Sequence, residues 1–123
     1  MYCFDTSVWV ALFLEFDVHH KEAARIMEGV GYNSIYLPYS IASETITVLT
    51  YKHSKKQAEA FIDFIKGDSR IIFLDNHLAS ELAFYKTISR RLSFADASLV
   101  HLSKSWKVTI VSFDKQLLSE ISK

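Results

Sequence analysis

The sequence predicts an α/β fold in which parallel strands are joined by helical crossovers. Short apolar runs that are typical of strands alternate with longer segments whose apolar residues recur at helical spacing. The 3 Gly and the single Pro lie near the ends of these segments, where they end elements. The sequence contains no visible repeat or linker, so one compact domain over residues 1–123 is expected.

The expected elements follow one another in a regular order. A strand at 2–4 leads through helices at 7–15 and 19–28 to a second strand at 35–37. Helices at 40–53 and 55–66 lead to a third strand at 70–74, and helices at 76–89 and 93–105 lead to a fourth at 107–113. A last helix is expected at 114–121. Helical spacing is clearest in two sets of apolar residues: Ala58, Phe61, Ile62 and Ile65, and Leu78, Leu82 and Tyr85.

Charge and cysteine content exclude several classes of protein. With 14 Lys and Arg against 14 Asp and Glu, the chain has no overall basic field that could hold a nucleic acid by charge alone. The single Cys3 excludes an internal disulfide and fits a buried thiol in a reducing compartment. The longest apolar stretch, residues 8–16, is broken by Glu15 and is too short to span a membrane, and Asp5 argues against a signal peptide, so a cytoplasmic protein is expected.

Four carboxylates stand among apolar or small residues instead of in charged surface runs. Asp5 and Asp114 directly follow strand-like runs, whereas Glu44 and Asp96 lie in the first turns of expected helices. The carboxyl ends of parallel strands share one edge of a sheet, and the helix after the second strand begins there. The helix of Asp96 must start near the same edge, provided that segment 76–89 lies across the fold. All four side chains are therefore expected to converge.

Helix capping is a structural explanation for three of these four acids. Asp5 and Asp114 could be N-caps, and Ser93 with Asp96 matches a capping box. Glu44 has no capping role, and its place three residues after Ile41 predicts that it lies on the sheet-facing side of its helix. Taken singly, capping explains most of the acids well, but four capping residues at one edge are a less probable arrangement than a site.

The expected cluster favours the chemistry of a hard metal ion. Oxygen ligands without His or Cys at ligand spacing select Mg2+ or Mn2+ over Zn2+, and such ions activate water for phosphodiester hydrolysis. The five His residues show no mutual spacing of a metal site and are assigned no role.

The motifs around the four acids together resemble the PIN-domain ribonucleases, particularly the small VapC-like toxins of type II toxin-antitoxin systems. The matching stretches are Phe4-Asp5-Thr6-Ser7, Ser43-Glu44, Ser93-Phe94-Ala95-Asp96-Ala97 and Ser112-Phe113-Asp114. Their order and spacing agree with the family along nearly the whole chain.

This resemblance implies a metal-dependent endoribonuclease with a three-layer α/β/α, Rossmann-like fold and a mainly parallel sheet of four or five strands. By analogy, Asp5 and Asp96 would be the principal Mg2+ or Mn2+ ligands. Glu44 and Asp114 would complete the acidic pocket, and the hydroxyls of Thr6 and Ser112 would support it. The family also implies an RNA substrate, a homodimer and a small antitoxin partner. Many members have a further short strand, whereas this sequence stops at Lys123.

Contacts to RNA would have to come from local basic residues. Arg90 and Arg91 precede the helix of Asp96, Lys115 follows Asp114, and a further basic cluster lies at 52–56. For each arginine taken singly, a solvated loop between two helices is a somewhat better explanation than RNA contact.

Other functions remain open from the residues alone. A phosphoacceptor receiver domain has a similar length, and Asp75 follows the third strand as in such a domain, although a helix cap explains Asp75 better. A haloacid-dehalogenase-like phosphatase requires an acid where Ser7 stands. A non-catalytic binding module could use the acidic edge or surplus aromatic residues such as Phe64 and Phe84 to dock a partner, including a second copy of the chain.

Overall fold

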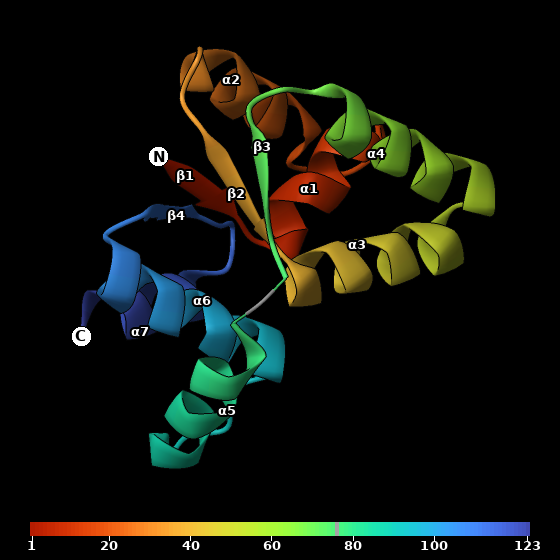
Figure 1. The fold of residues 1–123 in the computed structure, drawn as a ribbon. Helices are drawn as coiled ribbons and strands as arrows, with labels where there is room; N and C mark the ends of the chain where they lie inside the picture. The colour runs from red at the N-terminus through yellow and green to blue at the C-terminus, as the bar shows by residue number, and fades with distance from the viewer. Residues whose placement is uncertain (76) are drawn as a thin grey trace.

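A computed structural model describes residues 1–75 and 77–123 (Figure 1). Its four-stranded sheet has the order β3-β2-β1-β4, and every pair of neighbouring strands is parallel. The strands are β1 (Tyr2–Phe4), β2 (Ile35–Pro38), β3 (Ile71–Leu74) and β4 (Thr109–Val111). The predicted α/β class with a parallel four-stranded sheet is confirmed.

Helices connect every pair of successive strands, as expected for parallel crossovers. In the described residues, two helices lie between β1 and β2, two between β2 and β3, and two between β3 and β4, and one follows β4. Their bounds are α1 (Thr6–Phe13), α2 (His20–Val30), α3 (Tyr39–Lys52), α4 (Lys55–Gly67), α5 (Leu78–Thr87), α6 (Phe94–Trp106) and α7 (Lys115–Ser122). Each begins and ends within about two residues of its predicted position, the usual uncertainty of helix boundaries.

The helices form two groups on either side of the sheet (Figure 1). Helices α1 to α4 contact one another, and α5 to α7 form the second group, in which α6 contacts both of its neighbours. The chain moves outward from β1 through β2 to β3 and then returns to β4 on the other side of β1. Because such crossovers are right-handed, this reversal puts the last helices on the opposite face.

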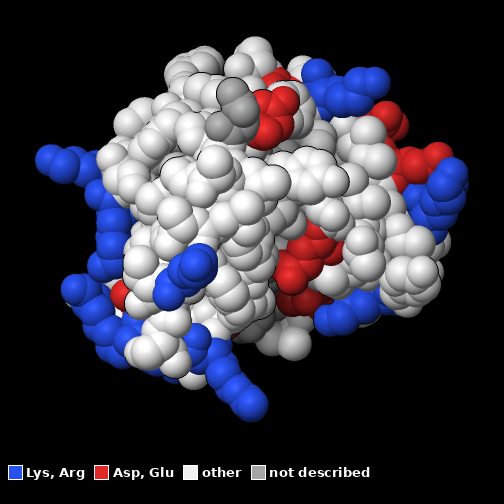
Figure 2. All heavy atoms as spheres, turned by 60° about the horizontal axis from the view of Figure 1, so that its bottom comes forward, with Lys and Arg blue, Asp and Glu red and all other residues white. Residues whose placement is uncertain are grey.

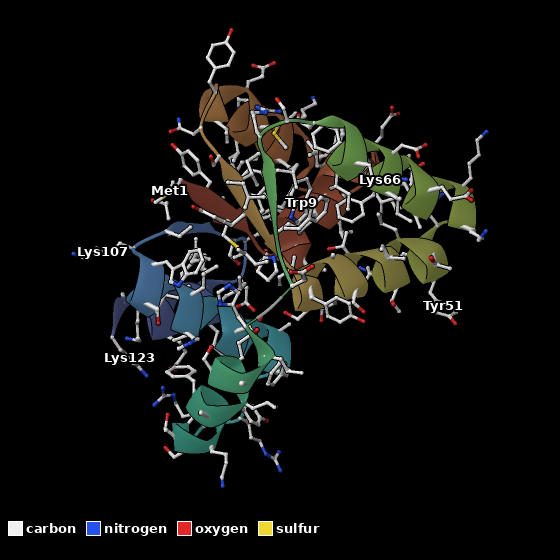
Figure 3. The ribbon with its side chains drawn as sticks, viewed as in Figure 1. Met1, Trp9, Tyr51, Lys66, Lys107 and Lys123 are labelled. Carbon is white, nitrogen blue, oxygen red and sulfur yellow. The ribbon has the colours of Figure 1, made fainter. Side chains whose placement is uncertain are left out.

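The core includes residues on both sides of the sheet, and its aromatic part lies between the sheet and the first group of helices. Trp9 of α1 is fully buried and lies among aromatic rings, with ring centroids 5.2 Å from Phe4 and 5.3 Å from Phe61 (Figure 3). Phe64, one of the predicted surplus aromatics, packs against Trp9 at 6.1 Å. Cys3 is buried in β1, as expected, and burial raises the pKa of its thiol far above the usual range.

The last strand is shorter than the predicted 107–113. Lys107 has a left-handed backbone, with φ of 55°, and ends α6 instead of joining β4. At the other end, Ser112 lies outside the strand, and its hydroxyl hydrogen-bonds to Asp5, which follows β1, and to Asp114, which precedes α7.

Helix α5 lies beyond the carboxyl ends of the strands and projects from the sheet (Figure 1). It has no buried residue and contacts α6. Asn76, where we expected this helix to begin, lies outside the described residues. Phe84 is half-buried beside His101, with ring centroids 4.9 Å apart. This placement allows α6 to start at the carboxyl edge, which was the uncertain step in the predicted convergence.

None of the helices in the described residues is long and apolar enough to cross a lipid bilayer.

Candidate active site at the carboxyl edge of the sheet

Asp5 is the buried member of the four predicted acids, with 5% of its surface exposed. It follows β1 directly and caps α1, since its Oδ1 accepts hydrogen bonds from the Ser7 hydroxyl at 2.5 Å and from the Val8 amide at 3.3 Å. Burial raises the pKa of Asp5, and hydrogen bonds from Ser112, Ser7 and the backbone oppose that increase. The carboxylate is thus held in one orientation by neutral donors.

The loop after β4 reaches Asp5 from the far end of the chain. The Ser112 hydroxyl donates to Asp5 Oδ2 and accepts a hydrogen bond from the Asp114 amide at 2.9 Å. Asp114 is exposed and caps α7 through its Oδ1, which accepts from the amides of Gln116 and Leu117 at 2.9 and 3.2 Å. The N-cap explanations of Asp5 and Asp114 are therefore correct, and they are compatible with a site.

Glu44 lies at an exposed position of α3, so the prediction that it faces the sheet is wrong. The buried residues of α3 are Ile41, Thr45 and Leu49, and Glu44 lies about 100° around the helix from Thr45. Its Oε1 accepts a hydrogen bond from the Thr6 hydroxyl at the start of α1. This bond links the second crossover to the first at the carboxyl edge.

Asp96 lies half-buried in the first turn of α6. The cap of α6 is Ser93, which accepts from the Asp96 amide at 3.0 Å, and within the described residues no amide donates to the Asp96 carboxylate. Burial raises the pKa of Asp96, and the charges of Asp114, Asp5 and Glu44 raise it further. The other three charges thus all act on Asp96, and the four carboxylates are called the acid cluster below.

Among the residues that the structure describes, no cationic side chain forms an ion pair with the acid cluster. Within the described residues, the ion pairs involve Glu59, Asp68 and Glu120, and none involves a member of the cluster. Figure 2 shows acidic atoms in a recess of the face that contains the carboxyl edge, with Lys and Arg side chains mostly toward its margin. Unpaired neighbouring carboxylates are costly unless a cation joins them, which is the chemical condition that Mg2+ or Mn2+ would satisfy.

The donor set therefore fits a hard divalent cation, although the side chains are not arranged as a ready-made coordination group. Among residues 1–75 and 77–123, no three His, Cys, Asp or Glu side chains are close enough together to hold a metal ion. The fit rests on the all-oxygen chemistry and on the uncompensated charge around Asp96.

The predicted RNA-contacting residues have different surroundings. The Arg90 guanidinium forms a 2.5 Å ion pair with Glu120 of α7. Arg91 is exposed in the loop before α6 and forms no ion pair within the described part of the chain, and Lys115 is exposed at the start of α7. Arg91 and Lys115 are thus better candidates for RNA contact than Arg90, whose guanidinium is paired with Glu120.

Sequence reasoning missed the role of Ser7. Its hydroxyl donates to Asp5 and accepts from the Phe113 amide at 3.2 Å, so it joins α1 to the loop before Asp114. A hydroxyl residue two positions after an N-cap aspartate was the available signal. Asp75 was also misjudged, because α5 begins after His77 and has no side-chain cap.

A comparison with protein-family models decides among the alternative folds. The model described as the PIN domain matches residues 2–123. This chain belongs to the PIN-domain family. The assignment removes the receiver and dehalogenase alternatives, and it confirms the resemblance drawn from the four acidic motifs.

A comparison with solved structures found a toxin whose fold is similar to that of this PIN domain. The chain superposes on VapC20 of Mycobacterium tuberculosis, described as a toxin that cleaves the sarcin-ricin loop, with a TM-score of 0.85 and 19% sequence identity. The similarity covers 97% of this chain and 94% of VapC20. At that identity the likeness concerns the fold. No curated protein sequence matches the chain.

Proposed function

We propose that this PIN domain is a Mg2+- or Mn2+-dependent endoribonuclease that hydrolyses RNA phosphodiester bonds. The observation that carries the proposal is that hydrogen bonds from Thr6 to Glu44 and from Ser112 to Asp5, and from the Asp114 amide to Ser112, bring three acids to the carboxyl edge where α6 begins with Asp96. Burial and the charges of those three acids raise the pKa of Asp96, in keeping with that placement. Membership of the PIN-domain family and the likeness of the fold to VapC20 support it.

The residues of the acid cluster and the hydroxyls beside them would have different roles in metal binding. Asp5 and Asp96 would be the principal metal ligands, with Glu44 and Asp114 completing the shell directly or through water. Thr6 and Ser112 hold the carboxylates of Glu44 and Asp5 by hydroxyl hydrogen bonds. A bound Mg2+ or Mn2+ supplies charge stabilisation at the phosphate and a more acidic water. The uncharged hydrogen bonds around Asp5 leave its negative charge available to the ion.

We further propose that the protein is the toxin of a toxin-antitoxin pair, that it forms a homodimer and that a small antitoxin covers the site. The exposed apolar side chains of β3 and α5, Ile72, Phe73, Leu78 and Leu82, are consistent with a protein partner. Sedimentation at increasing concentration tests the homodimer, and a strict monomer would contradict it.

The nuclease proposal is tested with purified protein and a labelled RNA. Cleavage is expected with Mg2+ or Mn2+ and not in EDTA, and Asp5→Asn should abolish it. Asp63→Asn, on the exposed side of α4, is the matched control and should cleave normally. If Asp5→Asn in EDTA cleaved the RNA as fast as the native protein does with metal, the mechanism would be contradicted. Absence of metal binding and cleavage in the native protein would instead favour a non-catalytic binding module.

A further inference from the structure

A pocket of about 610 Å3 opens beside the acid cluster. Four segments form it: the start of α3, the end of β3, the start of α5 and the start of α6. Glu44 lines this pocket and also belongs to the acid cluster. Of the other lining residues, Ala95 directly precedes Asp96, and Ser93 accepts a hydrogen bond from the Asp96 amide. A group bound in the pocket would therefore lie beside whatever the acid cluster holds.

The pocket has an aromatic and aliphatic lining. Tyr39 and Phe94, the first residues of α3 and α6, both line it, together with Leu74 and Leu78. Tyr39 is 72% exposed, whereas Phe94 is half-buried and rests against Tyr85, with ring centroids 5.7 Å apart. Such surfaces suit a flat ring, because single-stranded nucleic acids bind largely by stacking their bases on aromatic side chains.

The charges around the pocket exclude a phosphate as the natural occupant. Its lining contains the carboxylates of Glu44, Asp75 and Glu81 and the imidazole of His77, and among the described residues it contains no Lys or Arg. Carboxylates only accept hydrogen bonds when ionised, so they favour a ligand edge that presents N–H donors. Phosphate oxygens would be repelled.

We propose that this pocket binds an unpaired nucleobase of the RNA strand beside the cleaved phosphodiester, and that it prefers guanine. The Watson–Crick edge of guanine presents two adjacent N–H donors, which one carboxylate accepts together, whereas uracil presents one donor between two acceptors. This inference rests on the proposed ribonuclease function for its biological meaning. Recognition of the base itself requires neither metal nor cleavage.

The first test is binding of mononucleotides in EDTA. Titration of labelled protein with 5′-GMP or 5′-UMP, followed by backbone amide NMR, compares two bases that carry the same phosphate. GMP is expected to shift the amides of Ser43 and Ala95 saturably, and UMP to bind about tenfold more weakly or worse. Equal affinities for the two nucleotides, or no shifts at these amides, would overturn the inference.

Two substitutions separate stacking from edge recognition. Tyr39→Ala should weaken GMP binding about fivefold or more, the loss typical of one base-stacking contact. The matched control is Tyr51→Ala, on the same helix but 85% exposed and directed away from the protein (Figure 3). Glu81→Gln should reduce the preference for GMP over UMP. A loss that is equal in Tyr39→Ala and Tyr51→Ala would contradict a stacking role.

Cleavage assays then distinguish failure of this inference from failure of the proposed function. A single-stranded RNA with one guanosine should be cut faster by the native protein than the same RNA with inosine or uridine there, and Tyr39→Ala should reduce that difference. RNA cleavage without any base preference would overturn the pocket assignment alone. Selective GMP binding by a protein that cuts no RNA would support the pocket and refute the nuclease.

Discussion

The hydroxyl of Ser112 donates a hydrogen bond to the carboxylate of Asp5, a residue 107 positions earlier in the chain. Since β1 and β4 are parallel neighbours, with Phe4 opposite Val111, the residues just after them emerge at the same edge of the sheet. The Ser112 hydroxyl also accepts from the Asp114 amide, so one side chain positions two members of the acid cluster. Sheet pairing thus organises the candidate site.

Substitution of Ser112 by Ala should destabilise the protein. The buried Asp5 carboxylate would lose one of its donors, and a hydrogen bond to a charged group contributes about 2 kcal/mol. Chemical denaturation should show a lower midpoint with an unchanged slope. Ser119→Ala, at an exposed position of α7, is the control and should change stability little. An unchanged midpoint for Ser112→Ala would mean that this bond contributes nothing to stability.

Asp96→Asn should remove nuclease activity, with a loss of about 100-fold or more, because the substitution removes a charge at the centre of the acid cluster. Initial rates on one RNA at saturating Mn2+ measure this loss. Asp63→Asn serves again as the control. Retention of most of the activity by Asp96→Asn would exclude Asp96 as a principal ligand.

The same variant should be more stable than the native protein at neutral pH without metal. Burial and neighbouring carboxylates raise the pKa of Asp96 above its unfolded value, so ionised Asp96 destabilises the folded state. This penalty disappears as the pH falls through the raised folded pKa toward 3.8. Thermal melts in EDTA should therefore show a higher Tm for Asp96→Asn at neutral pH, with the difference shrinking in acid. A lower Tm for the variant at neutral pH would refute this electrostatic account.

Arg90 and Arg91 should differ sharply when each is changed to Ala. Arg90→Ala removes an ion-pair partner from Glu120, whose carboxylate is buried, so unfolding should occur at a lower denaturant concentration. Arg91→Ala should leave stability unchanged within about 0.5 kcal/mol. If Arg91 contacts an RNA phosphate, its loss should lower the slope of log affinity against log salt by about 0.7. A salt slope identical to that of the native protein would remove Arg91 from the RNA-binding surface.

Local features explain why most of the fold was predictable. Apolar periodicity over 55–66 predicted α4, and the capping box at Ser93 predicted the start of α6, where the structure has the Ser93 cap. The predicted element boundaries were wrong where a residue forms a long-range contact or has an unusual backbone conformation. Ser112 left the predicted strand to bind Asp5, and Lys107 took a left-handed conformation.

The sequence by itself determined the α/β class, the order of the elements and the four carboxylates at element ends, because apolar periodicity and capping are local properties of the chain. Only the tertiary structure decided that Glu44 is exposed and bonded to Thr6, that Glu120 pairs with Arg90, and that Ser7 bridges Asp5 to the Phe113 amide. Each of these contacts joins segments far apart in the sequence. Their partners are fixed by how the strands pair and how α5 projects from the sheet, which local spacing does not encode.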